Sequence, residues 1–199
     1  MEKNADSTHP DFWTIRYATG RTPWDFGGVP AALKSFLASS SAPVRVLIPG
    51  CGYGYEVQAF HTAGYDVTAI DFSSAAIDQA KSVLGALAEK VIFGDFFTYD
   101  FGQPRFDLIY ERTFLCSMPP SRWPDYASRM ADLLSSRGRL IGFFFYAEQP
   151  LPGPPYPLTN GQAEQLFQSR FQLVRNASVT DSLPLFQGME RWQEWLKTI

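Results

Sequence analysis

The stretch VRVLIPGCGYGYE, residues 44–56, places a strand, a glycine-rich turn and the start of a helix next to one another. The β-branched, apolar run Val44–Ile48 predicts a buried strand. The turn Gly50–Gly54 follows the pattern G-x-G-x-G, and residues without Cβ atoms let the backbone turn tightly and approach a ligand closely. A helix is predicted over residues 55–63, with Gly64 as its stop. This order is typical of the first unit of a ligand-binding parallel sheet.

The segments on either side of this stretch alternate between strand and helix patterns. Apolar runs predict further strands at residues 66–70, 90–93, 106–110 and 140–146. Helical spacing predicts helices from Ser73 to about Leu84, from Ser121 to a stop at Gly138, and over residues 159–167. Two final strands are predicted at residues 171–178 and 189–197, although the last segment fits a helix equally well. The alternation predicts an α/β fold, a mostly parallel sheet with helices on both faces.

Composition narrows the class of protein. A chain of 199 residues that is 45% hydrophobic suits one folded domain. A net charge of −3 provides no attraction to nucleic acid or to an anionic membrane. Two cysteines cannot build a disulfide framework or a cysteine zinc site, and no metal site is predicted. The start MEKNADSTHPDF lacks the apolar segment of a signal peptide, and no run is long enough to span a bilayer, so we expect a cytoplasmic protein.

Acidic residues follow the second and third predicted strands. Asp71 lies about twenty residues beyond Gly50, the separation at which an acid accepts hydrogen bonds from a ribose. The alternative is an acid that stabilises the start of a helix. Asp95 and the backbone N–H of Phe96 are suited to the edge of an adenine, although a plain turn would look the same. Because Tyr55 breaks the pattern G-x-G-x-x-G, this chemistry favours S-adenosylmethionine over a dinucleotide.

The fourth predicted strand ends in two opposite charges, Glu111 and Arg112. One interpretation is that they pair with each other or with other surface groups. The other is that Arg112 helps to orient the cofactor or an anionic nucleophile. Sequence alone leaves both open.

Aromatic residues gather ahead of the first strand, in FWTIRYATGRTPWDFGG. For Phe12 we favour an amphipathic helix that packs on the edge of the sheet. For Trp13 and Trp24 we favour a lid, because aromatic faces attract a sulfonium cation and a lid excludes water. Residues 1–40 are therefore predicted as an aromatic lid segment, and residues 41–199 as the Rossmann-like core of the same domain.

Seven short motifs follow one another along this chain: W-x3-Y, GRTPWD, LIPGCGYGYE, AIDFS, GDFF, YERTFLCSMPP and GPPY. Together they resemble the thiopurine S-methyltransferase superfamily, which includes bacterial thiol methyltransferases and plant thiocyanate and halide methyltransferases. The resemblance covers essentially the whole chain. It implies a class I S-adenosylmethionine-dependent methyltransferase fold of seven strands, the last of them antiparallel, and the product S-adenosylhomocysteine.

The resemblance also implies a set of cofactor contacts. With the strand-end residues, it predicts a cofactor site made of Trp13, Tyr17, Trp24, Gly50, Cys51, Gly52, Asp71, Phe72, Asp95, Phe96 and Arg112. Tyr17 stands where halide-type members usually have Trp, and Arg112 stands where they tend to have Tyr. By contrast, Asp95–Phe97 looks more like the halide and thiol branch. The acceptor therefore does not follow from the resemblance.

A small thiol is the acceptor that suits these residues best. A thiol already supplies some thiolate at neutral pH, so methyl transfer to it needs no strong base. Neither histidine is well placed as a base: His61 falls on the predicted helix after the glycine loop. We predict Asp25, Arg112 and Tyr156 as the polar groups that handle substrate, with a packed loop tyrosine as the alternative for the last.

Other interpretations stay open at this point. Cys51 and Cys116 are expected to be small buried side chains rather than nucleophiles. The methyl acceptor could instead be a halide, oxygen or nitrogen, or the enzyme could cyclise its cofactor and release methylthioadenosine. A nicotinamide oxidoreductase and a non-catalytic cofactor-binding module are the rivals from other classes. We expect a small-molecule acceptor and a monomer.

Overall fold

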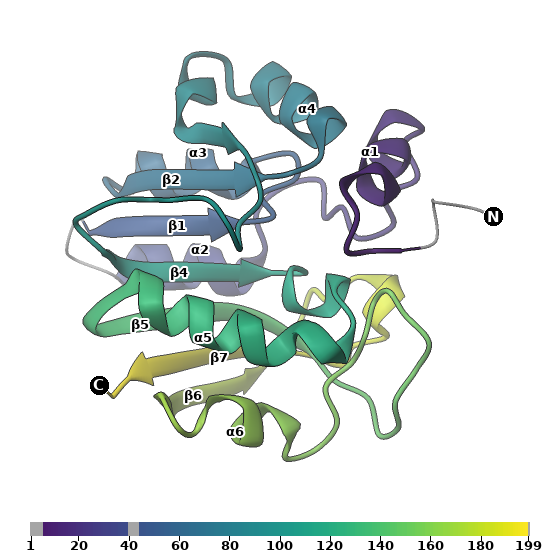
Figure 1. The fold of residues 1–199 in the computed structure, drawn as a ribbon, viewed down its shortest axis with the longest axis vertical. Helices are drawn as coiled ribbons and strands as arrows, with labels where there is room; N and C mark the ends of the chain where they lie inside the picture. Colours follow the sequence, from purple (N-terminus) through teal and green to yellow (C-terminus); the bar gives the residue numbers. More distant parts are fainter. Residues whose placement is uncertain (1–5, 40–43, 199) are drawn as a thin grey trace.

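The fold is one seven-stranded sheet between two layers of helices. The computed structural model describes residues 6–39 and 44–198. The strand order is β3-β2-β1-β4-β5-β7-β6, and β7 runs antiparallel to both of its neighbours (Figure 1). The strands are β1 (Arg45–Pro49), β2 (Asp66–Asp71), β3 (Val91–Phe93), β4 (Phe106–Arg112), β5 (Leu134–Phe145), β6 (Phe171–Ser178) and β7 (Glu190–Lys197). The predicted fold class, including the antiparallel last strand, is confirmed.

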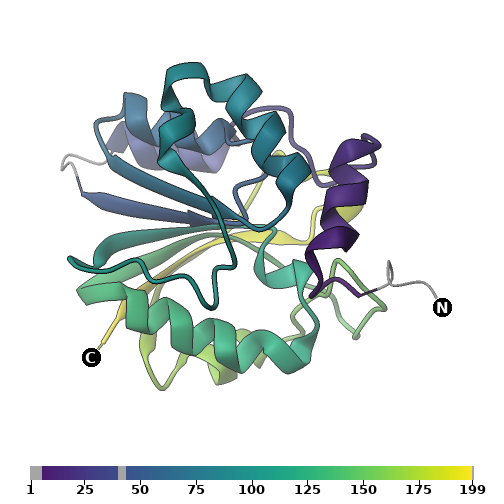
Figure 2. The same ribbon diagram turned by 45° about the horizontal axis from the view of Figure 1, so that its top comes forward.

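Helices cover both faces of this sheet, as Figure 2 shows. They are α1 (Pro10–Ala18), α2 (Ala31–Ser39), α3 (Tyr55–Thr62), α4 (Ser74–Leu84), α5 (Trp123–Leu133) and α6 (Gln162–Phe167). On one face, α2, α3 and α4 bury Leu33, Phe60 and Ile77 against the sheet. On the other face, α5 and α6 bury Tyr126 and Phe167. Both faces of the central strands are therefore apolar, as a parallel sheet requires.

The first helix stands apart from these layers. Figure 1 shows α1 beyond the carboxyl ends of β1 and β2, where it packs against α4. Phe12 is buried, but its helix packs against α4 and not on the edge of the sheet as expected, and Trp13 is only half-buried. The predicted lid segment thus contains α1 over the strand ends and α2 in the core. The predicted boundary between residues 40 and 41 lies outside the described residues.

Most predicted elements are confirmed to within a few residues. Ser73 caps α4 as expected, since its hydroxyl accepts a hydrogen bond from the Ala76 N–H at 3.2 Å. The last segment is a strand, β7, rather than a helix. In the described residues there is no helix long and apolar enough to cross a membrane.

The helix predicted from Ser121 to Gly138 is wrong at both ends. A short 3-10 turn occupies Pro120–Arg122, α5 ends at Leu133, and β5 begins at the next residue. Leu134 is extended and pairs with Phe106 of β4, so sheet pairing overrides the helical pattern. Gly138 lies inside β5, beside a shift in register, and its bare Cα leaves room for Leu134. The glycine therefore marks an irregular strand and not a helix stop.

Candidate functional site

A cavity of about 350 Å³ lies at the carboxyl ends of the strands, next to α1. Eight residues of the predicted cofactor site line it: Trp13, Tyr17, Trp24, Gly50, Asp71, Phe72, Asp95 and Phe96. A smaller cavity of about 50 Å³ adjoins it at the glycine loop. Cys51, Gly52 and Arg112, the other predicted cofactor residues, line this second cavity together with Asp25. The structure thus brings the predicted set into two connected spaces.

The loop after β1 has no room for side chains at two of its glycines. Gly50 has a φ of +60°, and a Cβ there would come within 2.5 Å of the Phe114 ring. Gly52 has a φ of +53°, and its Cβ would lie 2.5 Å from the hydroxyl of Tyr17. The two glycines therefore keep the backbone exposed to the cavities and also let the aromatic residues close over it.

Asp71 ties this loop to the end of β2. Its Oδ2 accepts a hydrogen bond from the Gly52 N–H at 3.1 Å, and its Oδ1 accepts one from the Ser73 N–H at 2.9 Å. Burial raises the pKa of this carboxyl to about 6, although these backbone hydrogen bonds act in the opposite direction. A carboxylate oxygen can accept more than one hydrogen bond, so Asp71 can serve the loop and a ribose together.

The turn after β3 presents Asp95 and Phe96 to the same cavity. Asp95 is exposed, and its Oδ1 accepts a hydrogen bond from the Phe97 N–H at 2.8 Å. Phe96 is buried, with its ring edge-to-face against Phe97 at 5.3 Å and against Phe114 at 5.2 Å. Both the turn and the adenine interpretations are compatible with this geometry, because the carboxylate shapes the turn and still borders the cavity.

Aromatic rings from α1 and the segment after it close the cavity on one side. Trp13 meets Trp24 edge-to-face at 5.2 Å, and Trp24 meets Tyr17 at 5.8 Å. Their polar atoms are bonded: the Trp24 indole N–H donates to the Tyr17 hydroxyl at 3.2 Å, and that of Trp13 donates to the Ser7 carbonyl at 2.8 Å. These bonds hold the ring faces that a sulfonium cation would meet.

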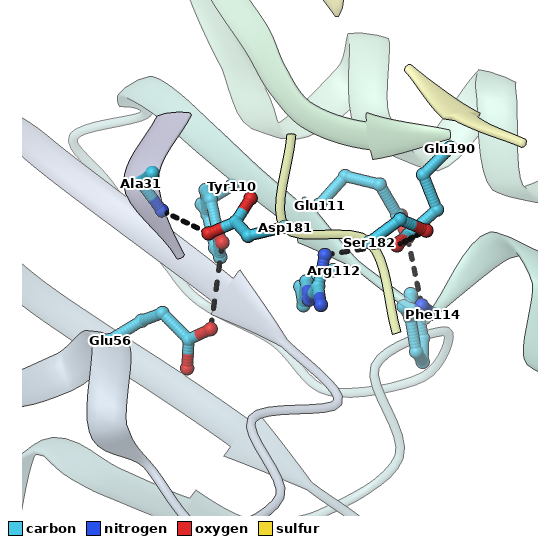
Figure 3. A network of polar contacts seen from close by, with 9 residues as sticks. All are labelled: Ala31, Glu56, Tyr110, Glu111, Arg112, Phe114, Asp181, Ser182 and Glu190. Carbon is cyan, nitrogen blue, oxygen red and sulfur yellow. Dashed lines mark hydrogen bonds and ion pairs between the residues drawn. The ribbon is translucent and has the colours of Figure 1, made fainter. Parts of the chain in front are cut away.

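Arg112 pairs with another charged group, as one interpretation held, but that group is Glu190 and, among the described residues, not Glu111. Successive side chains of a strand point to opposite faces, and the two separate accordingly. Arg112 Nη1 donates to Oε1 of Glu190 on β7 at 2.9 Å, and Ser182 donates to the other oxygen at 2.7 Å (Figure 3). We call these three residues the arginine network. The Arg112 guanidinium also lies over the Phe143 ring, with 4.3 Å to its centroid.

Glu111 instead holds the loop that follows β4. Its Oε1 accepts hydrogen bonds from the N–H groups of Phe114 and Leu115 at 2.8 and 3.0 Å, and its Oε2 accepts one from the Tyr126 hydroxyl at 2.5 Å. Burial raises the pKa of Glu111 to about 7, against the effect of these bonds. The carboxyl therefore fixes Phe114, which lines the main cavity.

The other two predicted substrate groups, Asp25 and Tyr156, differ in their position relative to the cavities. Asp25 borders the small cavity, and its Oδ1 accepts a hydrogen bond from the Gly27 N–H at 2.9 Å. Tyr156 is not among the described residues that line either cavity. Its backbone N–H donates to the Cys116 carbonyl at 2.7 Å, and its ring packs against the core and Gly153. The structure thus agrees with the packed alternative for Tyr156, while its neighbours Pro154 and Pro155 reach the cavity.

Both cysteines are buried as expected, and both histidines lie away from the cavities. Cys51 and Cys116 are buried, and burial raises the pKa of both thiols. His61 is exposed on α3, and His9 caps α1 through its Nδ1. Neither histidine lines the described parts of the two cavities.

Sequence reasoning missed two groups of residues. One group lines the main cavity and is apolar: Phe97, Phe114, Met118, Leu185 and Phe186. The other consists of acids that act near Arg112, namely Glu56 and Glu190. Glu56 stands directly after the glycine loop, so its place in the motif was a usable signal. Glu190 had none, because 78 positions separate it from Arg112.

Comparison with known proteins identifies the family. The thiopurine S-methyltransferase profile matches residues 8–198. The chain belongs to the thiopurine S-methyltransferase family. A probable thiol methyltransferase 2 of Arabidopsis thaliana is 31% identical over 192 residues, covering 94% of this chain and 84% of that protein. Thiocyanate methyltransferase 1 of the same plant is 30% identical, covering 88% and 80%.

Solved structures agree on the fold. A 1,6-didemethyltoxoflavin-N1-methyltransferase of Burkholderia thailandensis, crystallised with S-adenosylhomocysteine, has a TM-score of 0.78 and 22% identity, covering 96% of this chain and 87% of that one. Membership of the family confirms the predicted class, an S-adenosylmethionine-dependent methyltransferase. The nicotinamide oxidoreductase is thereby set aside.

The residues that line the two cavities fit S-adenosylmethionine. The two glycines form a cradle that a Cβ would fill, and aromatic rings face it. In addition, Nη2 of Arg112 is buried with no hydrogen-bond partner among the described residues. A buried guanidinium N–H without an acceptor is costly, so an acceptor from a bound molecule suits this position.

Proposed function

We propose that this protein methylates a small thiol at sulfur, with S-adenosylmethionine as the methyl donor. The single observation that supports a soft, apolar acceptor is the apolar lining of the main cavity outside the predicted cofactor residues. Phe97, Phe114, Met118 and Phe186 belong to this lining, and one of the charged residues of the cavity, Arg122, forms an ion pair with Asp125 at 3.2 Å. The names of the plant relatives, thiol and thiocyanate methyltransferases, point to the same kind of nucleophile.

In this proposal the chain holds the cofactor at both ends. Asp71 takes the ribose, Asp95 and Phe96 take the adenine, and the glycine loop lies against the methionine part. Phe72, Cys51 and Gly52 complete the contacts, and the rings of Trp13, Tyr17 and Trp24 face the sulfonium. Arg112 and Asp25 handle the polar end of the site, and Tyr156 is kept as a prediction for substrate handling.

When bound, S-adenosylmethionine supplies a methyl group whose bond to the sulfonium breaks as the thiolate sulfur forms its own, leaving S-adenosylhomocysteine and a thioether. The chain contributes orientation, because rigid aromatic walls hold two reactants in line. It also excludes water through the lid. The proton of the thiol leaves to solvent before transfer, since a thiol near its free pKa is partly ionised and needs no dedicated base.

A panel of acceptors tests this proposal. Purified protein with S-adenosylmethionine is given thiols, selenols, halides, thiocyanate and phenols, and S-adenosylhomocysteine release is measured for each. We expect the highest kcat/KM with a thiol and no methylthioadenosine among the products. A halide or phenol that exceeded every thiol by tenfold would overturn the thiol assignment. Methylthioadenosine as the main product would instead indicate cyclisation of the cofactor.

A further inference from the structure

The charged side chains of the main cavity divide into two sets. The acids among its described lining residues are Asp71 and Asp95, which the proposed function assigns to the cofactor. The other charged side chains are all arginines: Arg16, Arg21 and Arg122. Outside the cofactor residues, the charge of the described lining is therefore positive. We call Arg16 and Arg21, which belong to α1 and the segment after it, the lid arginines.

Arg122 differs from the lid arginines because it has an acidic partner. It forms an ion pair with Asp125 at 3.2 Å, and its guanidinium lies over the Phe97 ring, with 4.5 Å to the centroid. Its charge is thus offset by a neighbouring carboxylate. Neither Arg16 nor Arg21 has an ion pair within the part of the chain that the structure describes. The charge of the lid arginines is therefore the uncompensated charge of the cavity.

The backbone holds the lid arginines next to each other. Trp13, Arg16 and Tyr17 are separated by three and four positions on α1, so they share the face that lines the cavity. The backbone N–H of Arg21 donates to the carbonyl of Arg16 at 2.9 Å, so the chain turns back after the helix. Burial lowers the pKa of the Arg16 guanidinium, and the nearby charge of Arg21 lowers it further. A bound anion would relieve this repulsion.

Most N–H groups of the lid arginines remain available to a ligand. Arg16 Nη1 donates to the Phe12 carbonyl at 2.9 Å, and its guanidinium lies over the Phe12 ring, with 3.3 Å to the centroid. Arg21 Nε donates to the Thr19 hydroxyl at 3.3 Å. A guanidinium has five N–H donors, so these contacts use only a minority of them. The planar fork of such donors matches the two oxygens of a carboxylate.

We propose that the methyl acceptor is a mercapto acid, a small thiol that also carries a carboxylate, and that the lid arginines bind this carboxylate. This inference rests on the proposed function and narrows its substrate class. The apolar lining of the same cavity, which includes Phe114 and Met118, suits the hydrocarbon part of such a molecule. The thiol sulfur remains the methylated atom, and the carboxylate serves only for binding.

The acceptor is a better source of this carboxylate than the cofactor. S-adenosylmethionine brings a sulfonium cation, which two arginines repel, and the proposed function assigns its methionine part to the glycine loop. An anionic acceptor is attracted both by the sulfonium and by the lid arginines. A cleft lined by one sign of charge also raises the local concentration of a substrate of the opposite sign.

A pair of matched thiols tests the proposal. Wild-type protein and variants are given S-adenosylmethionine with 3-mercaptopropionate or its uncharged amide, and S-adenosylhomocysteine release is measured. With kcat/KM corrected for the fraction of thiolate, we expect the wild type to prefer the acid by about fivefold or more. Because Arg21 is exposed, Arg21→Gln leaves the core intact, and it should abolish most of this preference through the KM of the acid. Arg21→Lys retains the charge and should retain part of the preference.

Two controls separate binding of the carboxylate from other effects. Arg105→Gln makes the same change at an exposed arginine that lines neither cavity among the described residues, and it should leave the preference unaltered. The Kd for S-adenosylhomocysteine should stay within about twofold of the wild-type value in Arg21→Gln, since the lid arginines are assigned to the acceptor. Added salt should reduce the advantage of the acid in the wild type, because it screens exposed charges.

The wild type alone can overturn the proposal, whether or not a variant folds. Equal corrected kcat/KM values for the acid and the amide would refute the mercapto-acid assignment. Equal losses for both thiols in Arg21→Gln would assign this arginine to the reacting sulfur or to the fold, and would refute it as well. If the wild type released no S-adenosylhomocysteine with any thiol, the proposed function itself would fail.

Discussion

The glycine loop and the arginine network border the same site but are held in different ways. Asp71 receives its hydrogen bonds from the backbone N–H groups of Gly52 and Ser73, which lie 19 and 2 positions away. Arg112 meets Glu190 side chain to side chain across 78 positions, with Ser182 behind it. Every residue offers the same backbone donor, whereas a side-chain pair needs both partners. The loop is thus specified within one β1–α3–β2 unit, whereas the network depends on how β4, β5 and β7 assemble.

The largest expected effect comes from a substitution in β5, the strand that lies between β4 with Arg112 and β7 with Glu190. Gly142 of β5 has a φ of +146°, and a Cβ there would lie 1.9 Å from the backbone oxygen of Glu111. We expect Gly142→Ala to lower the free energy of unfolding by about 2–4 kcal/mol in urea titrations, because neither backbone can yield within the sheet. Gly188→Ala is the control: its φ is +75° but its surroundings are open, so a loss of about 1–2 kcal/mol is expected. Similar losses for both would show that the strand contact is unimportant.

Removing the acid of the glycine loop should have the next largest effect. Asp71→Ala is expected to weaken S-adenosylhomocysteine binding by about 1–3 kcal/mol, since it removes the proposed ribose acceptor, the bond to Gly52 in the loop and the bond to Ser73. Titration calorimetry measures this change. Asp66→Ala, at the exposed start of the same strand, should leave the affinity unaltered. An unchanged affinity in Asp71→Ala would refute the ribose assignment.

The contribution of Glu111 on β4 to stability should depend on pH. The folded pKa of Glu111 is about 7 and the ordinary value is 4.5, so the folded state binds more protons between these pH values. Its contribution to stability is therefore present below about pH 4.5 and is lost as the pH rises to about 7. The free energy of unfolding of the wild type should fall between pH 5 and pH 8. In Glu111→Gln we expect this fall to be smaller by on the order of 1–2 kcal/mol, as measured by urea titrations at the two pH values. Parallel pH profiles for wild type and variant would contradict the assignment.

The outer hydrogen bond of the arginine network should matter least. Ser182→Ala removes the bond to Glu190 but leaves the ion pair with Arg112 in place. We expect a loss of stability of about 0.5–1.5 kcal/mol by thermal or urea unfolding. Exposed Ser178 on β6 offers the same substitution as a control, with no measurable change expected. A loss of 3 kcal/mol or more in Ser182→Ala, well beyond about 1 kcal/mol per hydrogen bond, would show that the network is held together through this serine.

Much of the molecule followed from local patterns. The glycine loop, the acid after β2 and the cap at Ser73 were predictable, because each depends on residues close in sequence. The end of α5 was not, since Leu134 has helical spacing but gains a strand partner in β4. The place of Tyr156 was not predictable in the same way: its N–H donates to the carbonyl of Cys116, and Pro154 and Pro155, rather than Tyr156, are among the described residues that line the cavity.

The sequence by itself determined the family, the alternation of strands and helices, and the end of the sheet at which the candidate site lies. These features depend on short motifs and on periodicity, which a single strand–loop–helix unit expresses in full. Only the tertiary structure decided which charges meet around Arg112. Glu111 adjoins it in the chain but faces the opposite side of β4, whereas Glu190 arrives through the antiparallel β7. Pairing across a sheet is set by strand order and register, which no local stretch contains.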